Sequence, residues 1–377
     1  MKIAIDARFL GPVGTGLGKY TEKLLENLQE IDKKNHYFIL LKKENYNFFQ
    51  SKNKNFKRIL ADVPWYSPSE QIKIPQILAR IKPDLVHFCH FNVPVFFTGK
   101  FVVTIHDLIK HEFSDLASTT RNPLIYFLKH RAYKVVISTA IGQSSKILVP
   151  SNWIKKRILA EFKVPENKIV VTYEAADELF GQQLIVNSKQ VLKKYKIEPP
   201  FLIYVGNLYP YKNLEVVLKA LKILERDPPP TGGLKFFVAS ARDVFHQRFA
   251  QLVKNYKLEN RVIMPGFVPT SDLVVLFKLA KALVFPSLSE GFGIPGCNAL
   301  VAGLPVLAAD IPVFHEVYSD AVLYFDPKNE KDLAEKIKKI SKDEQLRKNL
   351  ISKGKNQVAK YSWQKMTSET LLVYNSL

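Results

Sequence analysis

The chain has 377 residues, of which 47% are hydrophobic and 24% are charged, and its net charge is +20 at pH 7. A single hydrophobic core stops growing at roughly 250 to 300 residues, so this length predicts two domains, and the apolar content excludes an intrinsically disordered chain. No apolar run approaches the ~20 residues that a membrane-spanning helix requires. The start Met1-Lys-Ile-Ala-Ile5 has the pattern of a first strand, not of a signal peptide. Cys89 and Cys297 have no metal-ligand spacing around them, as expected for buried, reduced thiols of a cytoplasmic protein.

The excess of positive charge is spread along the chain, with +10 in residues 1–180 and +10 in the remainder. Such a balance favours an anionic partner, such as a membrane surface or a lipid-diphosphate acceptor, and we expect no nucleic-acid partner. The strongest local candidate for membrane contact is the segment 42–58, where lysines and arginine alternate with aromatic residues. The alternative for this segment is a solvated lysine-rich loop whose aromatic side chains pack inward.

In chain order, short apolar strands alternate with amphipathic helices, which predicts parallel sheets covered by helices on both faces. The first helix is expected from Gly18 to about Ile31. Residues 181–200 contain several lysines and the pair Pro199-Pro200, and they are interpreted as a linker between domains 1–180 and 201–360. Strands are expected near residues 2–6, 37–41, 85–88, 101–105, 146–149 and 169–172, and then near 201–205, 234–239, 262–264, 282–285, 306–308 and 322–325.

The most informative segment follows the expected strand 282–285. A turn with Gly291 and Gly293 surrounds a lone carboxylate, Glu290, and a helix is expected to begin at Pro295. Backbone amides at a helix N-terminus suit a phosphate or the hydroxyls of a sugar, and a carboxylate can accept two neighbouring hydroxyls. The alternative is an ordinary strand-to-helix turn.

Three further positions follow expected strands and therefore lie where ligands of parallel sheets bind. The pattern Gly14-x-Gly16-x-Gly18 has the wrong spacing for a dinucleotide fingerprint. His106 ends the strand 101–105, and a lone histidine is more often structural than catalytic. Lys212 follows the strand 201–205, where a cation can neutralise a departing diphosphate without a metal; the alternative is a surface charge. The sequence has no Asp-x-Asp motif for a divalent ion.

In this order and spacing the motifs resemble family 4 (group 1) glycosyltransferases, which are retaining enzymes of GT-B fold. That fold has two Rossmann-like parallel-sheet domains that face each other across a cleft. The resemblance implies an acceptor-side domain, 1–180, and a nucleotide-sugar donor domain, 201–360, with a C-terminal helix, about 361–377, that packs back onto the first domain; the alternative is a cap on its own domain. It also rests on Ile5-Asp-Ala-Arg8, Ile105-His106-Asp107-Leu108, Val149-Pro-Ser-Asn-Trp153, Tyr204-Val-Gly206-Asn-Leu-Tyr-Pro-Tyr-Lys212-Asn213 and Tyr361-Ser-Trp363.

The resemblance also implies roles for individual residues. The donor sugar would be bound by Glu290, Gly291, Phe292 and Gly293, the diphosphate by Lys212 and Gly16, the ribose by Asn298, and the base by backbone groups at Phe267 and Val268. Glu290, His106 and Lys212 would be the catalytic set, with Glu290 and His106 positioning the sugar and not serving as nucleophile and base.

Five positions depart from the family pattern. Asn298 stands where a second glutamate is usual, and an amide offers one uncharged acceptor oxygen to a ribose. Asn207 and Tyr211 occupy places where the family often has arginine, which predicts weaker diphosphate binding. Gly296 and Cys297 stand where a proline and an apolar residue are usual, which predicts a looser first turn of the helix.

The implied function is a metal-independent retaining glycosyltransferase. It would move a hexose of mannose or glucose type from a nucleotide diphosphate sugar to a glycan or lipid-linked acceptor in cell-surface polysaccharide synthesis. No cofactor and no metal are expected, and the expected location is the cytoplasm, either free or peripheral on the cytoplasmic face of the membrane. Two alternatives stay open: a nucleotide-sugar-binding protein without catalysis, and a nucleotide-sugar epimerase on the same fold.

Overall fold

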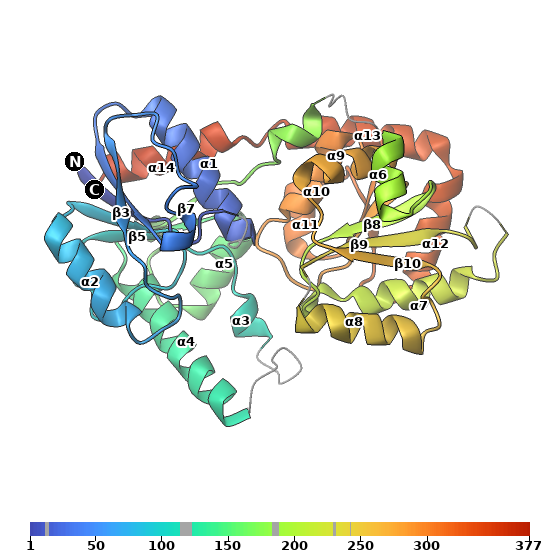
Figure 1. The fold of residues 1–377 in the computed structure, drawn as a ribbon, viewed down its shortest axis with the longest axis horizontal. Coiled ribbons are helices and arrows are strands. Elements are labelled where there is room, and N and C mark those ends of the chain that lie inside the picture. The colour runs from blue at the N-terminus through green and yellow to red at the C-terminus, as the bar shows by residue number, and fades with distance from the viewer. Residues whose placement is uncertain (12–14, 114–122, 183–187, 229–230, 242) are drawn as a thin grey trace. The chain divides into compact units, whose positions relative to one another are not determined.

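The computed structural model describes residues 1–377 except 12–14, 114–122, 183–187, 229–230 and 242. The described residues form two compact units (Figure 1). The first unit holds the described part of residues 1–174 together with Tyr361–Leu377, and the second holds the described part of Ala175–Lys360. Each unit has its own parallel sheet and its own buried core, so the prediction of two parallel α/β domains is confirmed.

The sheet of the first unit has seven parallel strands in the order β3-β2-β1-β4-β5-β6-β7. Every residue of β4 and β5 is buried, as expected for central strands that are covered on both faces. Because the strands are parallel, the residues that follow them lie at one edge of the sheet. The strands are β1 (Lys2–Asp6), β2 (His36–Leu41), β3 (Phe56–Leu60), β4 (Leu85–Phe88), β5 (Phe101–Thr104), β6 (Lys146–Val149) and β7 (Ile169–Val171).

Helices cover this sheet, and the C-terminal helix α14 packs on α1 within the first unit (Figure 1). Buried hydrogen bonds hold α14 in place: the Tyr374 hydroxyl lies 2.5 Å from His87 Nδ1, and His87 Nε2 lies 2.8 Å from Thr104 Oγ1. Burial keeps His87 neutral, with a pKa of about 3. The helices are α1 (Thr15–Ile31), α2 (Glu70–Ile81), α3 (Ile109–Glu112), α4 (Pro123–Gln143), α5 (Asn152–Glu161) and α14 (Trp363–Asn375), with short 3-10 turns at Lys43–Asn45 and Glu166–Lys168.

Strand β3 was not predicted, because its start lies inside the segment 42–58, where lysines interrupt the apolar pattern. Phe56 is 4% exposed and its ring stacks on Tyr37 with centroids 4.4 Å apart, and Phe49 is 5% exposed. Lys57 and Arg58 are exposed on the edge strand, a common way to protect an open sheet edge. Two of the four aromatic residues of the segment, Phe49 and Phe56, therefore pack inward, whereas Phe48 is 48% exposed.

The sheet of the second unit has six parallel strands in the order β10-β9-β8-β11-β12-β13. The strands are β8 (Phe201–Val205), β9 (Lys235–Ala239), β10 (Val262–Gly266), β11 (Ala282–Phe285), β12 (Val306–Ala309) and β13 (Leu323–Phe325). The helices are α6 (Ser188–Tyr195), α7 (Leu214–Leu224), α8 (Val244–Asn255), α9 (Thr270–Leu279), α10 (Ile294–Ala302), α11 (Pro312–Tyr318), α12 (Glu330–Lys342) and α13 (Glu344–Val358), with 3-10 turns at Glu178–Gly181 and Pro210–Lys212.

The segment 181–200, which the sequence suggested as a linker, instead contains α6 and belongs to the second unit. Lys194 Nζ and the Tyr195 hydroxyl each donate a hydrogen bond of 2.7 Å to Asp272 Oδ2 on α9. The lysines of this segment are the solvent-facing side of a short helix, which by composition alone resembles a linker. The boundary between the units falls between Glu174 and Ala175.

Candidate active site

The turn between β11 and α10 has the geometry that its glycines predict. Helix α10 begins at Ile294 with Pro295 in its first turn, and Gly293 precedes it with φ at 101°, a left-handed conformation that favours glycine. Phe292 is only 2% exposed, so its backbone, and not its ring, is what this residue can offer to a ligand.

Tyr318 of α11 explains why Gly296 stands where relatives usually have proline. Its hydroxyl donates a hydrogen bond to the Gly293 carbonyl. A Cβ at Gly293 would lie 2.2 Å from this hydroxyl oxygen, and a Cβ at Gly296 would lie 2.3 Å from it. The tyrosine fills the space that a side chain at either position would need. The predicted looser first turn is therefore wrong, because Tyr318 packs against it and bonds to it.

Lys212 and Glu290 meet beyond the carboxyl ends of β8 and β11, where they form an ion pair between Lys212 Nζ and Glu290 Oε1. The two side chains are 11% and 12% exposed. Asn213, which is left-handed with φ at 55°, fixes the lysine turn by donating from Nδ2 to the carbonyls of Pro286 (3.2 Å) and Pro327 (2.8 Å). The two residues predicted for the diphosphate and the sugar thus lie in one cluster, and each neutralises the other in the unliganded protein.

Asn298 has a structural partner that the sequence did not reveal. Its Oδ1 accepts a hydrogen bond of 2.8 Å from the Asp177 backbone N–H. Because an amide has a single oxygen, this bond leaves the Nδ2 hydrogens as the groups of Asn298 best placed to bond a ribose. The amide oxygen keeps one lone pair beyond this bond, so a ribose hydroxyl would share the oxygen with the Asp177 backbone N–H.

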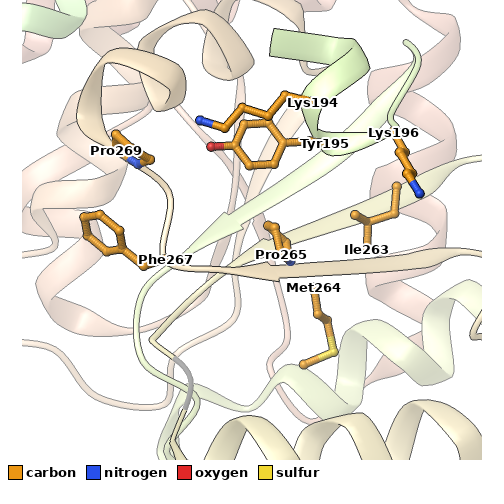
Figure 2. A pocket seen from close by; sticks show the side chains of 8 residues that line it. All are labelled: Lys194, Tyr195, Lys196, Ile263, Met264, Pro265, Phe267 and Pro269. Carbon is orange, nitrogen blue, oxygen red and sulfur yellow. The ribbon is translucent and has the colours of Figure 1, made fainter.

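The predicted base-binding residues lie at the end of β10. Val268 is 4% exposed, whereas Phe267 is 71% exposed. Phe267 also lines an open pocket of about 720 Å³, which lies beside the edge strand β10 and α6 (Figure 2). The other lining residues are Lys194, Tyr195, Lys196, Ile263, Met264, Pro265 and Pro269.

In the first unit, His106 follows β5, and acceptor oxygens face both of its ring nitrogens. Nδ1 lies 2.9 Å from Glu174 Oε1, and Nε2 lies 3.0 Å from the Cys89 carbonyl oxygen. When Glu174 is ionised, both nitrogens can donate to these oxygens, and this arrangement favours the protonated imidazolium. Burial alone would lower the pKa of His106, but the hydrogen bond and the charge of Glu174 outweigh burial and raise it. The Tyr20 ring meets the imidazole edge-on, with centroids 4.6 Å apart.

Glu174 was missed because it lies 68 residues from His106 in sequence and belongs to no motif. The contact between Glu174 and His106 could have been inferred only from the order of the strands in the sheet. Strands β5, β6 and β7 are neighbours, so residues that follow β5 and β7 lie at the same sheet edge.

Gly16 lies in the first turn of α1, where an added Cβ would meet no atom within 4 Å, so the space beside it is open. Gly18 differs, because a Cβ there would lie 2.1 Å from the Gly11 carbonyl oxygen. Packing therefore requires glycine at position 18, whereas position 16 is free to face a ligand. Gly14 lies outside the described residues. In the part of the chain that the structure describes, no group of three or more His, Cys, Asp or Glu side chains is placed to hold a metal ion.

These features define a two-unit α/β protein with an acidic and basic pair at the carboxyl edge of its second sheet. Its chain matches two protein-family models, one described as "Glycosyltransferase Family 4" over residues 15–178 and one described as "Glycosyl transferases group 1" over residues 187–357. The chain belongs to this family and is a glycosyltransferase of GT-B fold.

Individual relatives agree. The O-antigen chain mannosyltransferase RfbU of Salmonella typhimurium is 27% identical over 369 residues, which are 95% of each chain. Among solved structures, sucrose-phosphate synthase from Thermosynechococcus elongatus has a TM-score of 0.78 at 17% identity and covers 100% of this chain and 98% of its own. Anabaena Alr3699/HepE, solved in complex with UDP and glucose, has a TM-score of 0.77 at 16% identity, with 100% of both chains covered.

Proposed function

We propose that the protein transfers a hexose from a nucleotide diphosphate sugar to a glycan or lipid-linked glycan during cell-surface polysaccharide synthesis. The observation that carries the proposal is the Lys212–Glu290 pair at the turn before α10. One cation and one carboxylate side by side match a donor that carries a diphosphate next to sugar hydroxyls. The mannosyltransferase relative and the UDP and glucose complex of a protein with the same fold support a hexose donor.

In the proposed reaction, Glu290 accepts hydrogen bonds from donor-sugar hydroxyls, and Lys212 pairs with the diphosphate. The bond from the anomeric carbon to the phosphate oxygen breaks as the acceptor oxygen bonds to that carbon on the same face. The departing phosphate oxygen takes the acceptor proton, so configuration is retained without a protein base. Lys212 supports this step by stabilising the negative charge that grows on the leaving diphosphate.

The family resemblance implies that His106 positions the donor sugar, and this role remains part of the proposal. Because acceptor oxygens of the first unit already face both ring nitrogens, a sugar hydroxyl would have to replace one of these partners. The family resemblance implies that the Gly16 backbone approaches the donor diphosphate, and the space beside Gly16, where an added Cβ would meet no atom within 4 Å, is consistent with that role. Phe267 and Val268 are proposed to bind the base through their backbone groups.

Metal independence is part of the proposal, because a lysine can supply the charge that a divalent ion supplies in other transferases. The sequence has no Asp-x-Asp motif. The position of Tyr211, where relatives often have arginine, leaves Lys212 as the cation that neutralises the diphosphate within this cluster.

Contact with an anionic membrane is also proposed, and α4 supports it better than the segment 42–58. Phe127, Leu128 and Val135 of α4 are more than half exposed, and the Arg131 guanidinium lies 5.0 Å from the Phe127 ring centroid. Apolar side chains with cations among them suit a lipid interface. None of the helices in the described ranges combines the length and apolar character needed to cross a bilayer.

A second candidate is nucleotide-sugar binding without turnover, which the occupied acceptor oxygen of Asn298 favours. Transfer and binding without turnover are distinguished by incubating the protein with UDP-, GDP- and dTDP-linked hexoses, with and without EDTA. The measurements are thermal stability, release of nucleoside diphosphate, and the anomeric configuration of any product. Transfer with retention and no effect of EDTA is expected. A thermal shift without nucleotide release would support the binding protein, and inversion or inhibition by EDTA would contradict the proposed mechanism.

A further inference from the structure

A buried ionic cluster at the end of β1 does not take part in the proposed chemistry. The Arg8 guanidinium is fully buried, and its Nη2 donates to Asp6 Oδ2 and to Glu70 Oε1 at 2.6 Å each. Burying three charges is costly, and a well-packed apolar core would be at least as stable, so such clusters mark positions where a defined geometry matters.

Glu70 uses its other oxygen to fix a surface residue. Its Oε2 accepts a hydrogen bond of 3.0 Å from the Tyr66 backbone N–H and another from Asn92 Nδ2. Tyr66 has φ at 58°, a left-handed conformation that bulky residues rarely adopt, and its side chain is 51% exposed. Strain of this kind persists where surrounding contacts impose it, and it is concentrated at ligand-binding positions.

Around Tyr66 lies a cluster of aromatic rings, which we call the aromatic platform: Phe9, Trp65, Tyr66, His90 and Phe91. The Phe9 and Trp65 rings stack at 4.4 Å, and the His90 and Phe91 rings lie 3.9 Å apart. Trp65 Nε1 and His90 Nδ1 are buried and have no hydrogen-bond partner among the described residues. Protein covers both atoms, so they belong to the underside of the platform, and the ring that the platform exposes is that of Tyr66.

Lys110 adds a positive charge to the platform. Its ammonium lies 4.4 Å from the Tyr66 ring centroid and 5.3 Å from that of Phe91. No carboxylate among the described residues forms an ion pair with it, whereas Lys42, over the Trp65 ring, is paired with Glu44 at 2.7 Å. Lys110 therefore presents an ammonium that has no ion-pair partner among the described residues, although the charge of Asp107 acts on it, and aromatic faces hold it in place.

The platform residues follow β1, β3 and β4, and Lys110 follows β5, four residues after His106. They lie at the carboxyl edge of the first sheet, which is where ligands of parallel sheets bind. We propose that Tyr66, Phe91 and Lys110 form an acceptor subsite for a saccharide that carries a phosphate. The apolar face of the sugar ring packs on Tyr66, and the phosphate pairs with the Lys110 ammonium. This inference rests on the proposed transferase function and names the chemistry of its acceptor.

The test measures binding of three probes to the full chain by calorimetry: N-acetylglucosamine linked through a diphosphate to farnesol, N-acetylglucosamine 1-phosphate, and octyl N-acetylglucosaminide, which has no phosphate. Lys110→Met should weaken binding of both phosphate probes about 10-fold, as expected for loss of one charge-assisted contact, and leave the octyl glycoside unchanged. Tyr66→Asn should weaken all three. Equal affinity of the two phosphate probes would assign the site to sugar phosphates in general, and tighter binding of the farnesyl probe to lipid-linked acceptors.

Tyr66→Asn also separates function from structure, because asparagine tolerates the left-handed conformation. The variant should keep or gain thermal stability while it loses probe binding. Phe96→Ala, which removes an 85% exposed ring of the same unit, is the matched control and should change neither.

Unchanged binding in Tyr66→Asn and Lys110→Met, or no binding by the unmodified protein, would overturn the subsite. Loss of probe binding in Lys212→Met alone would do the same, since it would place the probes at the donor residues. Thermal stabilisation by nucleotide diphosphates is recorded in parallel, so that failure of donor binding is distinguished from failure of the acceptor subsite.

Discussion

Lys212 and Glu290 lie 78 residues apart in sequence, yet their side chains form one ion pair that is nearly buried. The opposite charges of Lys212 and Glu290, which the donor would bind, cancel each other in this ion pair. A diphosphate sugar that binds here must take over Lys212 with its phosphates and Glu290 with its hydroxyls, so both groups keep partners throughout. The pair thus brings together the cation and the carboxylate of the proposed donor site.

Removing one partner should harm stability and activity differently. Lys212→Met removes the cation that pairs with Glu290, whereas Glu290→Gln removes the carboxylate charge and keeps one acceptor oxygen, so both should lower the melting temperature and Lys212→Met should lower it more. The double variant should recover part of the loss, with a coupling on the order of 1 kcal/mol. Transfer should fall about 10²- to 10³-fold in Lys212→Met, because the leaving diphosphate loses its stabilising charge, and should not recover in the double variant.

Calorimetric melting and initial rates of nucleotide release check this prediction. Lys353→Met is the matched control, because it breaks an ion pair with Asp320 in which the lysine is 42% exposed, and little change is expected. Full activity of Lys212→Met would contradict the role of this lysine.

The contact between Gly296 and Tyr318 predicts a steric penalty. Gly296→Ala places a Cβ against the tyrosine hydroxyl, where the separation would be 2.3 Å, so the ring must move, at a cost of about 1–3 kcal/mol of unfolding free energy. Tyr318→Leu should reduce that cost in the double variant because it removes the obstructing hydroxyl. Chemical denaturation measures both, with Gly142→Ala of α4 as the control.

Gly142 is helical and a Cβ there would meet no atom within 4 Å, so alanine should be neutral or stabilising by about 0.5–1 kcal/mol. Equal effects of the two glycine substitutions would show that the Tyr318 contact is not the cause.

The positions of most strands could be predicted from the sequence, because apolar runs between amphipathic helices are typical of a parallel α/β fold. It missed β3, where Lys57 and Arg58 interrupt the apolar pattern of an edge strand, and it interpreted α6 as a linker because its exposed face is rich in lysine. Both errors occur where solvent exposure, and not burial, determines residue choice.

The sequence singled out the candidate site residues one by one, and the structure adds the contacts between them. Lys212 and Glu290 each stand out after a strand, and neighbouring strands bring them together. The bonds from Glu174 to His106 and from Asp177 to Asn298 could not be predicted, because they depend on loop conformations that lie outside any motif.

The charge of His106 predicts a pH dependence. Its pKa in the folded protein is raised above the ordinary value of about 6.5, so its contribution to stability is fully present below that value and is lost as pH rises through the raised pKa. Activity that depends on the imidazolium should decline on the same alkaline side. Glu174→Gln keeps an acceptor but removes the charge, so it should move this decline to lower pH.

Two readouts separate this role from a purely structural one: the pH profile of transfer, and the NMR titration of the His106 ring. Four other groups lie near the ring: Asp107 next to it in sequence, the Cys89 carbonyl, Tyr20 of α1 and His87 of β4. Glu174→Gln changes none of them. An unchanged titration of His106 in the variant would refute the assignment.

Asn298 provides the last prediction, because its one acceptor oxygen is already bonded to the Asp177 backbone N–H. Asn298→Ala should lower the unfolding free energy by about 1 kcal/mol, since this partly buried N–H loses its partner. Asn298→Glu supplies two oxygens, one for Asp177 and one for a ribose, so it should stabilise the fold as asparagine does and tighten donor binding up to about 10-fold. Titration calorimetry with nucleotide diphosphates measures the second effect. Tighter binding with faster transfer would show that asparagine limits the donor site, whereas tighter binding with loss of turnover would show that asparagine belongs to a working site that releases its nucleotide readily.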